Sequence, residues 1–361
     1  MLKQINLFFK KQNMKRKNIN VSKKTHNIFF HYLKDKKILS AFEKLDQILK
    51  KRLKNKSFSV AVSGGPDSLS LAYLSKCYAI QNDCKMSIFI VDHKLRKESS
   101  KEAKYVQKIL SKTGLRSKIL IWNSKKPLKN IQAVARENRL RLLIKACKSI
   151  NTKNLLIGHH EEDLYENFFI RLFRGSGLKG LSSFGEVNNN FNGISILRPM
   201  IGLSKENLIY ISKKVFKFYV SDPYNLDIKF KRSRLRKLIP EFIKEGLDSK
   251  KLRLTINNLK SSDLAINYYV EKNIENNSKF LKGRNCYIVK DTFFYEPKEI
   301  VLRSLLIILN QVSGRFYPPR GKNIIFAIEN LISKKVNKMT IGGCIIENFN
   351  KTVVITKETR A

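Results

Sequence analysis

Hydrophobic and polar positions follow two alternating periods through the middle of the chain. Short apolar runs, each about the length of a strand, are followed by segments in which apolar residues recur every three or four positions, as on one face of a helix. The expected strands are 58–62, 86–91, 118–122 and 153–157, and the expected helices are 69–74, 98–110, 130–150 and 161–173. Strands that alternate with helices are typical of βαβ units, so the pattern predicts an α/β fold, with a parallel sheet flanked by helices on both faces.

Different patterns precede and follow this region. Apolar residues recur at helical spacing from Ile38 to Leu49, and we expect folded structure to begin there. Residues 238–277 keep a helical spacing in a polar background, which predicts a small helical domain. The remainder mixes both periods and predicts a small α+β domain, with strands at 287–289, 344–346 and 353–355 and helices at 300–309 and 324–331.

The chain of 361 residues is therefore expected to have four parts: a basic extension over 1–37, a main α/β domain over 38–227, a helical domain over 228–285 and a C-terminal α+β domain over 286–361. The extension has no acidic residue up to Lys34. A basic, acid-poor segment can be a targeting peptide, but this one is rich in Lys and Asn rather than Arg and Ser. A disordered basic arm or a misassigned translation start is the simpler interpretation, and all three stay open.

The charge of the chain bears on its partners. Lysine and arginine number 72 against 29 aspartates and glutamates, for a net charge of +43. The chain is also rich in Asn, Ile and Lys, which AT-rich codons favour, so codon bias is one explanation for part of this excess. Even so, a surface this positive attracts polyanions, and nucleic acid is favoured over an anionic membrane surface. No uncharged apolar run of about 18 residues occurs, so no membrane-spanning helix is expected. The five cysteines have wide, irregular spacings, which excludes a CxxC-type site and favours a reducing compartment, the cytoplasm.

Polar clusters follow three of the expected strands. They are residues 63–68, Asp92 with His93, and Gly158 with His159 and His160. Because the carboxyl ends of parallel strands meet at one edge of a sheet, where α/β proteins bind ligands, these clusters predict a single site. A strand-end histidine pair that only caps the next helix, or an ordinary turn at Asp92, is the alternative.

The first of these clusters has the composition of a phosphate-binding loop. Its two glycines let the backbone approach a ligand, its proline suits a first helical turn, and the free N–H groups of that turn attract an anion. Its hydroxyls can donate to phosphate oxygens, and its aspartate can hold Mg²⁺ against them. The residues are Ser63, Gly64, Gly65, Pro66, Asp67 and Ser68. The loop lacks the spacing and the lysine of a Walker A motif, and an ordinary capped turn is the alternative.

The loop resembles the SGGxDS pyrophosphate loop of the N-type ATP pyrophosphatase (PP-loop) superfamily. Further elements resemble those of the tRNA(Ile)-lysidine synthases within it, and the resemblance covers roughly residues 38–245. These elements are VDHKLR at 91–96, ARENRL at 135–140, GHHEEDLYEN at 158–167, Arg198-Pro199, and Arg232, Arg234, Arg236 and Pro240. Where that family has Asp, Gln and Thr, this chain has Glu162, Leu164 and Asn167, which leaves the metal geometry at Glu162 open.

The resemblance implies an adenine nucleotide alpha hydrolase-like fold and an ATP-dependent reaction. Free L-lysine is joined to C2 of the wobble cytidine in the CAU-anticodon tRNA(Ile). An adenylated cytidine forms with release of pyrophosphate, the lysine amine then displaces AMP, and the codon read changes from AUG to AUA. ATP and Mg²⁺ are the implied cofactors, tRNA(Ile) and L-lysine are the implied partners, and a homodimer stays open.

The resemblance also implies catalytic roles for the residues that match the family's motifs. Asp67 and Asp163 are the implied Mg²⁺ ligands, with Glu162 as an additional carboxylate. His159 and Arg174 join them as candidate catalytic residues. His159 and His160 are expected where an adenylate or the target base could bind, and a neutral histidine there could also accept a proton from the incoming amine.

The resemblance also implies binding roles. The loop 63–68 is expected to bind the phosphates, Asp92 and His93 to lie on the adenine side, and the glycine-bearing segment 175–180 to cover the substrate. The candidate RNA-binding residues are Arg136, Arg139, Arg171, Arg232, Arg234 and Arg236. For these arginines a solvated basic helix face is the alternative.

Two rival functions remain. A tRNA-thiolating PP-loop enzyme is the nearer one, although the paired cysteines of such enzymes have no counterpart here. A non-catalytic RNA-binding protein on a decayed PP-loop fold is the other. Glu162 and Leu164 favour that second rival, whereas the intact loop from Ser63 to Ser68 opposes it.

Overall fold

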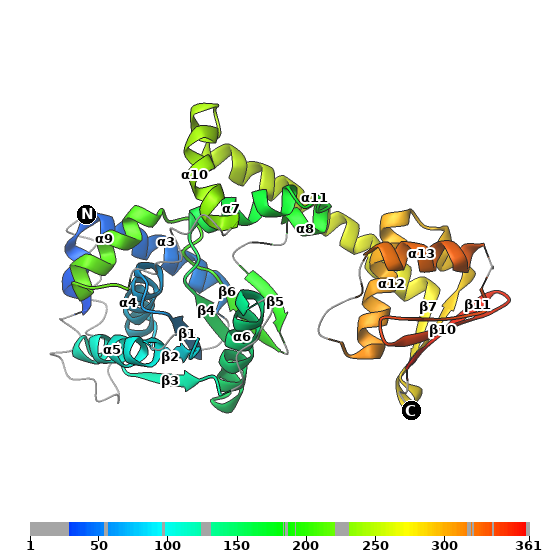
Figure 1. The fold of residues 1–361 in the computed structure, drawn as a ribbon, viewed down its shortest axis with the longest axis horizontal. Helices are drawn as coiled ribbons and strands as arrows, with labels where there is room; N and C mark the ends of the chain where they lie inside the picture. The colour runs from blue at the N-terminus through cyan, green and yellow to red at the C-terminus, as the bar shows by residue number, and fades with distance from the viewer. Residues whose placement is uncertain are drawn as a thin grey trace. The chain divides into compact units, whose positions relative to one another are not determined.

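The computed structural model describes residues 29–53, 57–95, 98–123, 131–182, 184, 187–191, 193–220, 231–315, 319, 321–333 and 336–358. Two compact units make up the chain: the first contains the residues up to 176 together with 183–248, and the second contains 177–182 and 249–361 (Figure 1). Among the described residues, no helix is both long enough and apolar enough to span a bilayer.

A six-stranded sheet with the order β3-β2-β1-β4-β6-β5 forms the centre of the first unit. Five neighbouring strands are parallel, as predicted, and β5 pairs antiparallel to β6 at the edge. The strands are β1 (Ser57–Val62), β2 (Lys85–Asp92), β3 (Ser117–Ile121), β4 (Asn154–Ile157), β5 (Val187–Phe191) and β6 (Ile194–Leu197). The four strands expected from the sequence are confirmed, and β5 and β6 add to them.

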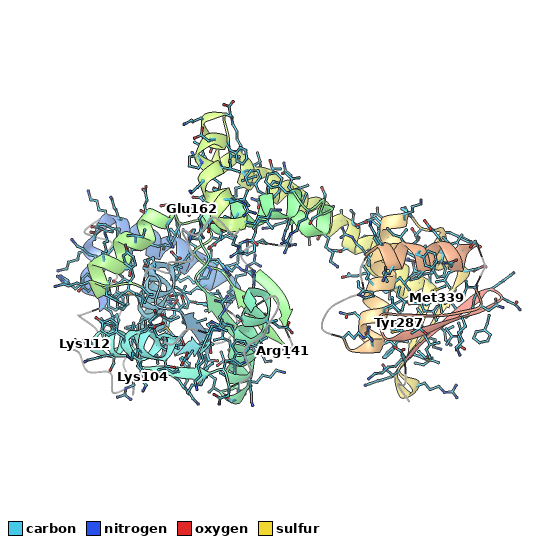
Figure 2. All side chains as sticks on the ribbon, viewed as in Figure 1. Lys104, Lys112, Arg141, Glu162, Tyr287 and Met339 are labelled. Atoms are coloured by element: carbon cyan, nitrogen blue, oxygen red, sulfur yellow. The ribbon has the colours of Figure 1, made fainter. Side chains whose placement is uncertain are left out.

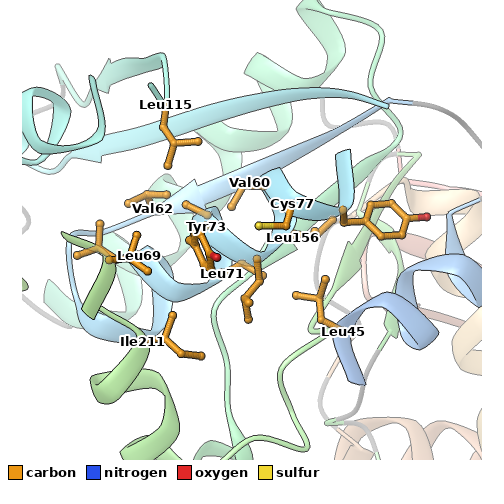
Figure 3. Packing of buried hydrophobic residues seen from close by; sticks show 14 of the residues in the cluster. Leu45, Val60, Val62, Leu69, Leu71, Tyr73, Cys77, Leu115, Leu156 and Ile211 are labelled. Atoms are coloured by element: carbon orange, nitrogen blue, oxygen red, sulfur yellow. The ribbon is translucent and has the colours of Figure 1, made fainter. Parts of the chain in front are cut away.

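Helices cover both faces of this sheet, because its side chains alternate between two cores. Val60 and Leu156 (Figure 3), with Ile88, face a large core shared with α3, α4, α5 and α9. Phe89 and Leu155 pack with α6 on the other face. The helices of this unit are α3 (Lys36–Arg52), α4 (Pro66–Gln81), α5 (Ser99–Lys112), α6 (Ile131–Ser149), α7 (Glu161–Leu172), α9 (Lys205–Phe216) and α10 (Lys231–Lys244).

The large core starts earlier in the chain than expected. Phe29, Phe30 and Leu33 are buried in it, ahead of and within the short 3₁₀ helix η1 (Tyr32–Lys34). The Tyr73 hydroxyl donates to the Phe29 carbonyl at 2.8 Å. Folded structure therefore includes residues before Ile38, and residues 1–28 lie outside the described part of the chain.

The second unit packs helices on an antiparallel sheet with the order β7-β8-β11-β10-β9. The strands are β7 (Ser278–Leu281), β8 (Cys286–Lys290), β9 (Lys338–Ile341), β10 (Cys344–Phe349) and β11 (Thr352–Lys357). The helices are α8 (Leu178–Ser182), α11 (Ser249–Asn277), α12 (Lys298–Ser313) and α13 (Gly321–Ile332), with the 3₁₀ helices η3 (Lys282–Arg284) and η4 (Asp291–Tyr295). The strands and helices expected after residue 286 are confirmed.

The helical segment expected over 228–285 is divided between the units. Helix α10 belongs to the first unit, where it packs on α7, and α11 belongs to the second, where it packs on α8 and α12. The segment 175–180, expected to cover the substrate as a loop, contains the start of α8.

Candidate active site

The phosphate-loop candidate lies where β1 passes into α4, and its backbone needs glycine at one position. Gly64 has φ +89°, a conformation that other residues adopt only with strain. A Cβ at Gly64 would lie 2.5 Å from Val106 Cγ2. The Gly64 carbonyl also accepts the Val220 N–H at 2.9 Å, so the tight turn is tied to a distant segment of the same unit.

Two serines close the loop on itself. The Ser68 hydroxyl accepts the Ser63 backbone N–H at 3.1 Å, donates to the Gly65 carbonyl at 3.0 Å and lies 3.2 Å from Ser63 Oγ. Pro66 is the first residue of α4, where its missing N–H costs nothing. The result is a compact turn around a helix N-terminus, which carries a partial positive charge and suits an anion.

The end of β4 touches this turn. A Cβ at Gly158 would lie 3.0 Å from Ser68 N and 3.1 Å from Asp67 C, so only glycine allows the two segments to approach this closely. Two of the polar clusters predicted to share one sheet edge therefore meet. They bring the start of α7 against the start of α4.

His160 lies among three carboxylates at the start of α7. Its Nδ1 is 2.7 Å from Glu162 Oε2, and its Nε2 is 3.8 Å from Asp67 Oδ2 and 3.6 Å from Asp163 Oδ2. Burial of His160 disfavours its charged form, but these carboxylates outweigh burial and raise its pKa. Burial would raise the pKa of Asp163, but His160, His159 and the His160 backbone N–H lower it, so the carboxylate is ionised.

Lys205, at the start of α9, completes this cluster. Its Nζ contacts both oxygens of Asp67, at 2.7 and 2.6 Å. Its backbone N–H donates to the Glu162 carboxylate, at 3.1 and 3.2 Å from the two oxygens. Glu162 (labelled in Figure 2) thus binds the N-terminus of α9 and the ring of His160 at the same time.

His159 points to a different set of partners. Arg198, which is buried, donates from Nε to His159 Nδ1 at 3.2 Å, and Phe184 lies edge-on to the imidazole at 5.3 Å between ring centroids. Burial, with Arg198 nearby, lowers the pKa of His159 to about 3, so the ring is neutral at pH 7. Because a guanidinium can only donate, Nδ1 is the acceptor and the proton of the neutral ring sits on Nε2.

Asp92 and His93 follow β2 but differ in environment. Both Asp92 oxygens accept hydrogen bonds, from Ser99 Oγ and the Lys94 N–H at 2.8 and 3.0 Å and from Ser100 Oγ at 2.5 Å. Asp92 therefore fastens the strand end to the start of α5. Burial, with Arg139 nearby, lowers the pKa of His93 to about 4, and its buried Nδ1 has no hydrogen-bond partner within the described residues.

Arginines from three elements surround the buried polar groups. Burial and the charges of Arg136 and Arg232 lower the pKa of Arg139 to about 10. Burial, with Arg136 nearby, also lowers the pKa of Arg198 to about 10. Arg232, on α10, contributes to the low pKa of Asp163. Cations crowded closely enough to lower one another's pKa favour the binding of an anion.

The remaining candidates lie farther along α7 and α10. Arg236 binds the fully buried Glu166, with Nε 2.5 Å from Oε1, so this guanidinium already has a partner. Arg171 is half-buried beside Arg174, and Arg234 is exposed on α10. Arg174 is exposed in the turn after α7, at the opposite end of that helix from Asp163, and the structure does not bring it to the carboxylate cluster.

Comparison with known proteins places the chain. Residues 38–242 match the PP-loop domain family. The tRNA(Ile)-lysidine synthase of Wolbachia pipientis wMel is 33% identical over 317 residues, which cover 84% of this chain and 71% of that protein. The protein of the same name from Bradyrhizobium diazoefficiens is 31% identical over 314 residues, with 80% and 86% covered. The chain belongs to the tRNA(Ile)-lysidine synthase family.

Membership of the tRNA(Ile)-lysidine synthases makes the protein a PP-loop enzyme of tRNA modification. Among solved structures, the U34-tRNA thiolase NcsA of Methanococcus maripaludis superposes with a TM-score of 0.54 at 20% identity, over 62% of this chain and 80% of that one. At that identity the likeness shows a shared fold.

The carboxylates of this tRNA(Ile)-lysidine synthase family member suit Mg²⁺. In the described part of the chain, no three His, Cys, Asp or Glu side chains are grouped as a self-sufficient metal site. Mg²⁺ in nucleotide enzymes is commonly held by one or two carboxylates together with substrate phosphates. Asp67 and Asp163, which face the same nitrogen of His160 beside the phosphate loop, fit that pattern.

Reasoning from the sequence missed two residues of this site. Arg198 was noted only as part of an Arg-Pro element, and Lys205 was not singled out, because a basic chain offers no local signal that distinguishes one lysine from 72 cationic residues. Both reach the site through packing of β6 and α9 against β4 and α4.

Proposed function

We propose that this enzyme joins free L-lysine to C2 of the wobble cytidine in the CAU-anticodon tRNA(Ile), at the expense of ATP. The cytosine O2 attacks the α-phosphorus of ATP, pyrophosphate leaves, and the lysine amine then displaces AMP from C2. The contact of the Ser63–Ser68 turn with Gly158, which joins a phosphate loop to the His160–Asp163 carboxylate cluster, carries the proposal. The family of the chain supports the tRNA substrate.

The residues of the phosphate loop would bind and orient the triphosphate. The N-terminus of α4 and the hydroxyls of Ser63 and Ser68 can donate to its phosphate oxygens. Asp67 and Asp163 would hold Mg²⁺, which when bound supplies neutralisation of phosphate charge. His93 is neutral, and its Nδ1 has no hydrogen-bond partner among the residues that the structure describes, so it stays the candidate for the adenine side, whereas Asp92 supports the strand end.

His159 is better suited to hydrogen-bond donation than to taking a proton. Its Nδ1 is occupied by Arg198, and its Nε2 carries the proton. We therefore assign His159 a donor role, toward the base or the adenylate, in place of the proton-accepting role implied by the resemblance. Arg198 acts on the substrate through His159, as a positioning residue.

The RNA path is proposed to follow α6, α7 and α10. Arg136, Arg139 and Arg232 supply cations near the site, Arg234 supplies an exposed one on α10, and Arg171 and Arg174 supply them at the far end of α7. There Phe173 is 53% exposed, with Lys231 Nζ 5.7 Å from its ring centroid. Exposed aromatic rings among cations are typical of surfaces that stack unpaired bases. We also propose a cytoplasmic location, where the five free cysteines would stay reduced.

The decisive assay measures pyrophosphate release from ATP in the presence of tRNA(Ile) with a CAU anticodon, with and without L-lysine. Lysine dependence and covalent incorporation of labelled lysine into the tRNA are expected. The thiolase alternative predicts persulfide on a cysteine and no lysine dependence, and a non-catalytic protein predicts no release with either addition.

Replacement of Asp67 tests the assignment of the phosphate loop. Asp67→Ala should slow pyrophosphate release by about a thousandfold or more, because charge stabilisation of the phosphates is lost. It should leave tRNA binding nearly unchanged. Filter binding of labelled tRNA provides the control. Turnover at the wild-type rate in this variant would contradict the role given to Asp67.

A further inference from the structure

The ammonium of Lys205 lies at the mouth of the phosphate loop, although nothing in the loop's own sequence supplies a cation. Lys205 Nζ binds both oxygens of Asp67 at 2.7 and 2.6 Å, and the two residues are 138 positions apart in the chain. Asp67 is in the first turn of α4, where the phosphates would meet the helix N-terminus. A loop of this type without a Walker A lysine still has to balance the charge of a triphosphate.

The backbone of Lys205 is anchored while its side chain keeps room to move. Its N–H is held by the carboxylate of Glu162, which in turn contacts the His160 ring. The Lys205 side chain is 37% exposed, against 21% for that of Asp67. A lysine side chain has four CH₂ groups joined by rotatable bonds, so the ammonium can change its partner without a shift of α9.

The pairing with Asp67 conflicts with the role proposed for that carboxylate. An aspartate with both oxygens held by an ammonium has to exchange that contact before it can ligate Mg²⁺. When nucleotide binds, the released ammonium lies beside phosphate oxygens, which accept charge-assisted hydrogen bonds stronger than those that water accepts. Lys205 exchanges a carboxylate for a phosphate and Asp67 exchanges an ammonium for Mg²⁺, so each charge keeps a partner of opposite sign.

We infer that Lys205 is the phosphate-binding cation of this site, stored on Asp67 in the free enzyme and transferred to the phosphate oxygens of ATP on binding. This inference rests on the proposed ATP chemistry. It also gives Glu162 a function that differs from metal ligation: it positions Lys205 through the N-terminus of α9.

The test measures affinity for the α,β-methylene analogue of ATP, which cannot release pyrophosphate, by calorimetry on the full chain with Mg²⁺ or with EDTA. Lys205→Met, which keeps length and removes charge, should weaken binding by roughly tenfold to a hundredfold in both conditions. Lys205→Arg should retain most of the affinity. Lys213→Met, an exposed lysine of the same helix, is the matched control and should bind as the wild type does.

A double-mutant cycle tests storage on Asp67. In EDTA, Asp67→Asn should tighten binding of the analogue, because it releases Lys205, and this gain should be much smaller in the Lys205→Met background. An equal gain in both backgrounds would refute storage. A Lys205→Met variant that binds the analogue as tightly as wild type, with only a lower melting temperature, would reduce the contact to a structural ion pair. If the wild type itself fails to bind the analogue, the proposed function falls as well.

Discussion

Gly64 is the residue on which the shape of the phosphate loop depends most directly. Its φ of +89° strains any other residue, and its neighbour Val106 leaves no room for a methyl group. Gly158 has a comparable role at the end of β4, where a Cβ would press on the backbone of Asp67 and Ser68. At the residue scale, the site therefore depends on two glycines, because the lack of a side chain at each position lets neighbouring segments approach closely.

Gly64→Ala should therefore lower both stability and nucleotide affinity. We expect a loss of about 1–3 kcal/mol in the free energy of unfolding, from strain and from the clash with Val106. Gly175→Ala is the matched control, because its φ is +68° but no atom lies within 4 Å of the place that the new methyl group would take. Chemical denaturation measures both variants. Equal losses would show that the clash at Gly64 is relieved without cost.

Helix α7 shows how one element can serve two parts of a function. Its N-terminal end carries Asp163 and follows His160, and its C-terminal end leads to Phe173 and the arginines near it. Helix α3, in contrast, has a structural role. Its N-cap, Asp35, accepts hydrogen bonds from the N–H groups of Lys37 and Ile38 and from the hydroxyl of Tyr210.

Phe173→Ala should weaken tRNA binding by roughly tenfold, the loss expected for one stacked base. Affinity for the ATP analogue should not change, because Phe173 lies at the far end of α7 from the phosphate loop. Leu172→Ala is the control, since Leu172 is 45% exposed but has no ring. Fluorescence anisotropy with labelled tRNA measures both. Similar losses for the two variants would point to general surface contact in place of stacking.

Asp35 should make the stability of the first unit depend on pH. The Tyr210 hydroxyl and the N–H groups of the helix lower the pKa of Asp35 below 3.8, its ordinary value. A carboxyl with a lowered pKa stabilises the fold above its unfolded pKa, and this contribution is lost as the pH falls through the folded pKa. Asp35→Ala should cost about 1 kcal/mol near pH 7, and the difference from wild type should shrink below pH 4, as followed by urea unfolding. A difference that grows on acidification would contradict this role.

At the scale of the whole molecule, each unit buries hydrophobic residues of its own. The first unit holds the candidate site, and the second has its own buried cluster around Leu305, Phe293 and Ile346. The chain's single tryptophan, Trp122, is buried in the first unit, so its fluorescence reports on that unit alone.

Leu305→Ala should test this division. Truncation of a fully buried leucine costs about 2–5 kcal/mol, and the loss should shift the part of the circular dichroism transition that belongs to the second unit. The Trp122 fluorescence transition should stay in place. Leu71→Ala, in the core of the first unit, should shift the fluorescence transition instead. Parallel shifts of both signals in both variants would show that the units unfold as one.

The sequence by itself determined four of the strands of the first unit with the helices that follow them, three strands and two helices of the C-terminal sheet domain, and the glycine-bearing turn at 63–68, because periodicity and turn chemistry are local properties. Edge strand β5 was not predicted, since its sequence VNNNF is poor in strand-forming residues. Only the tertiary structure decided that α10 and α11 belong to different units and that Arg198 orients His159. It also decided that Lys205 reaches Asp67 across 138 positions. These contacts depend on how distant segments pack, and a side chain carries no local mark of the partner that packing will bring to it.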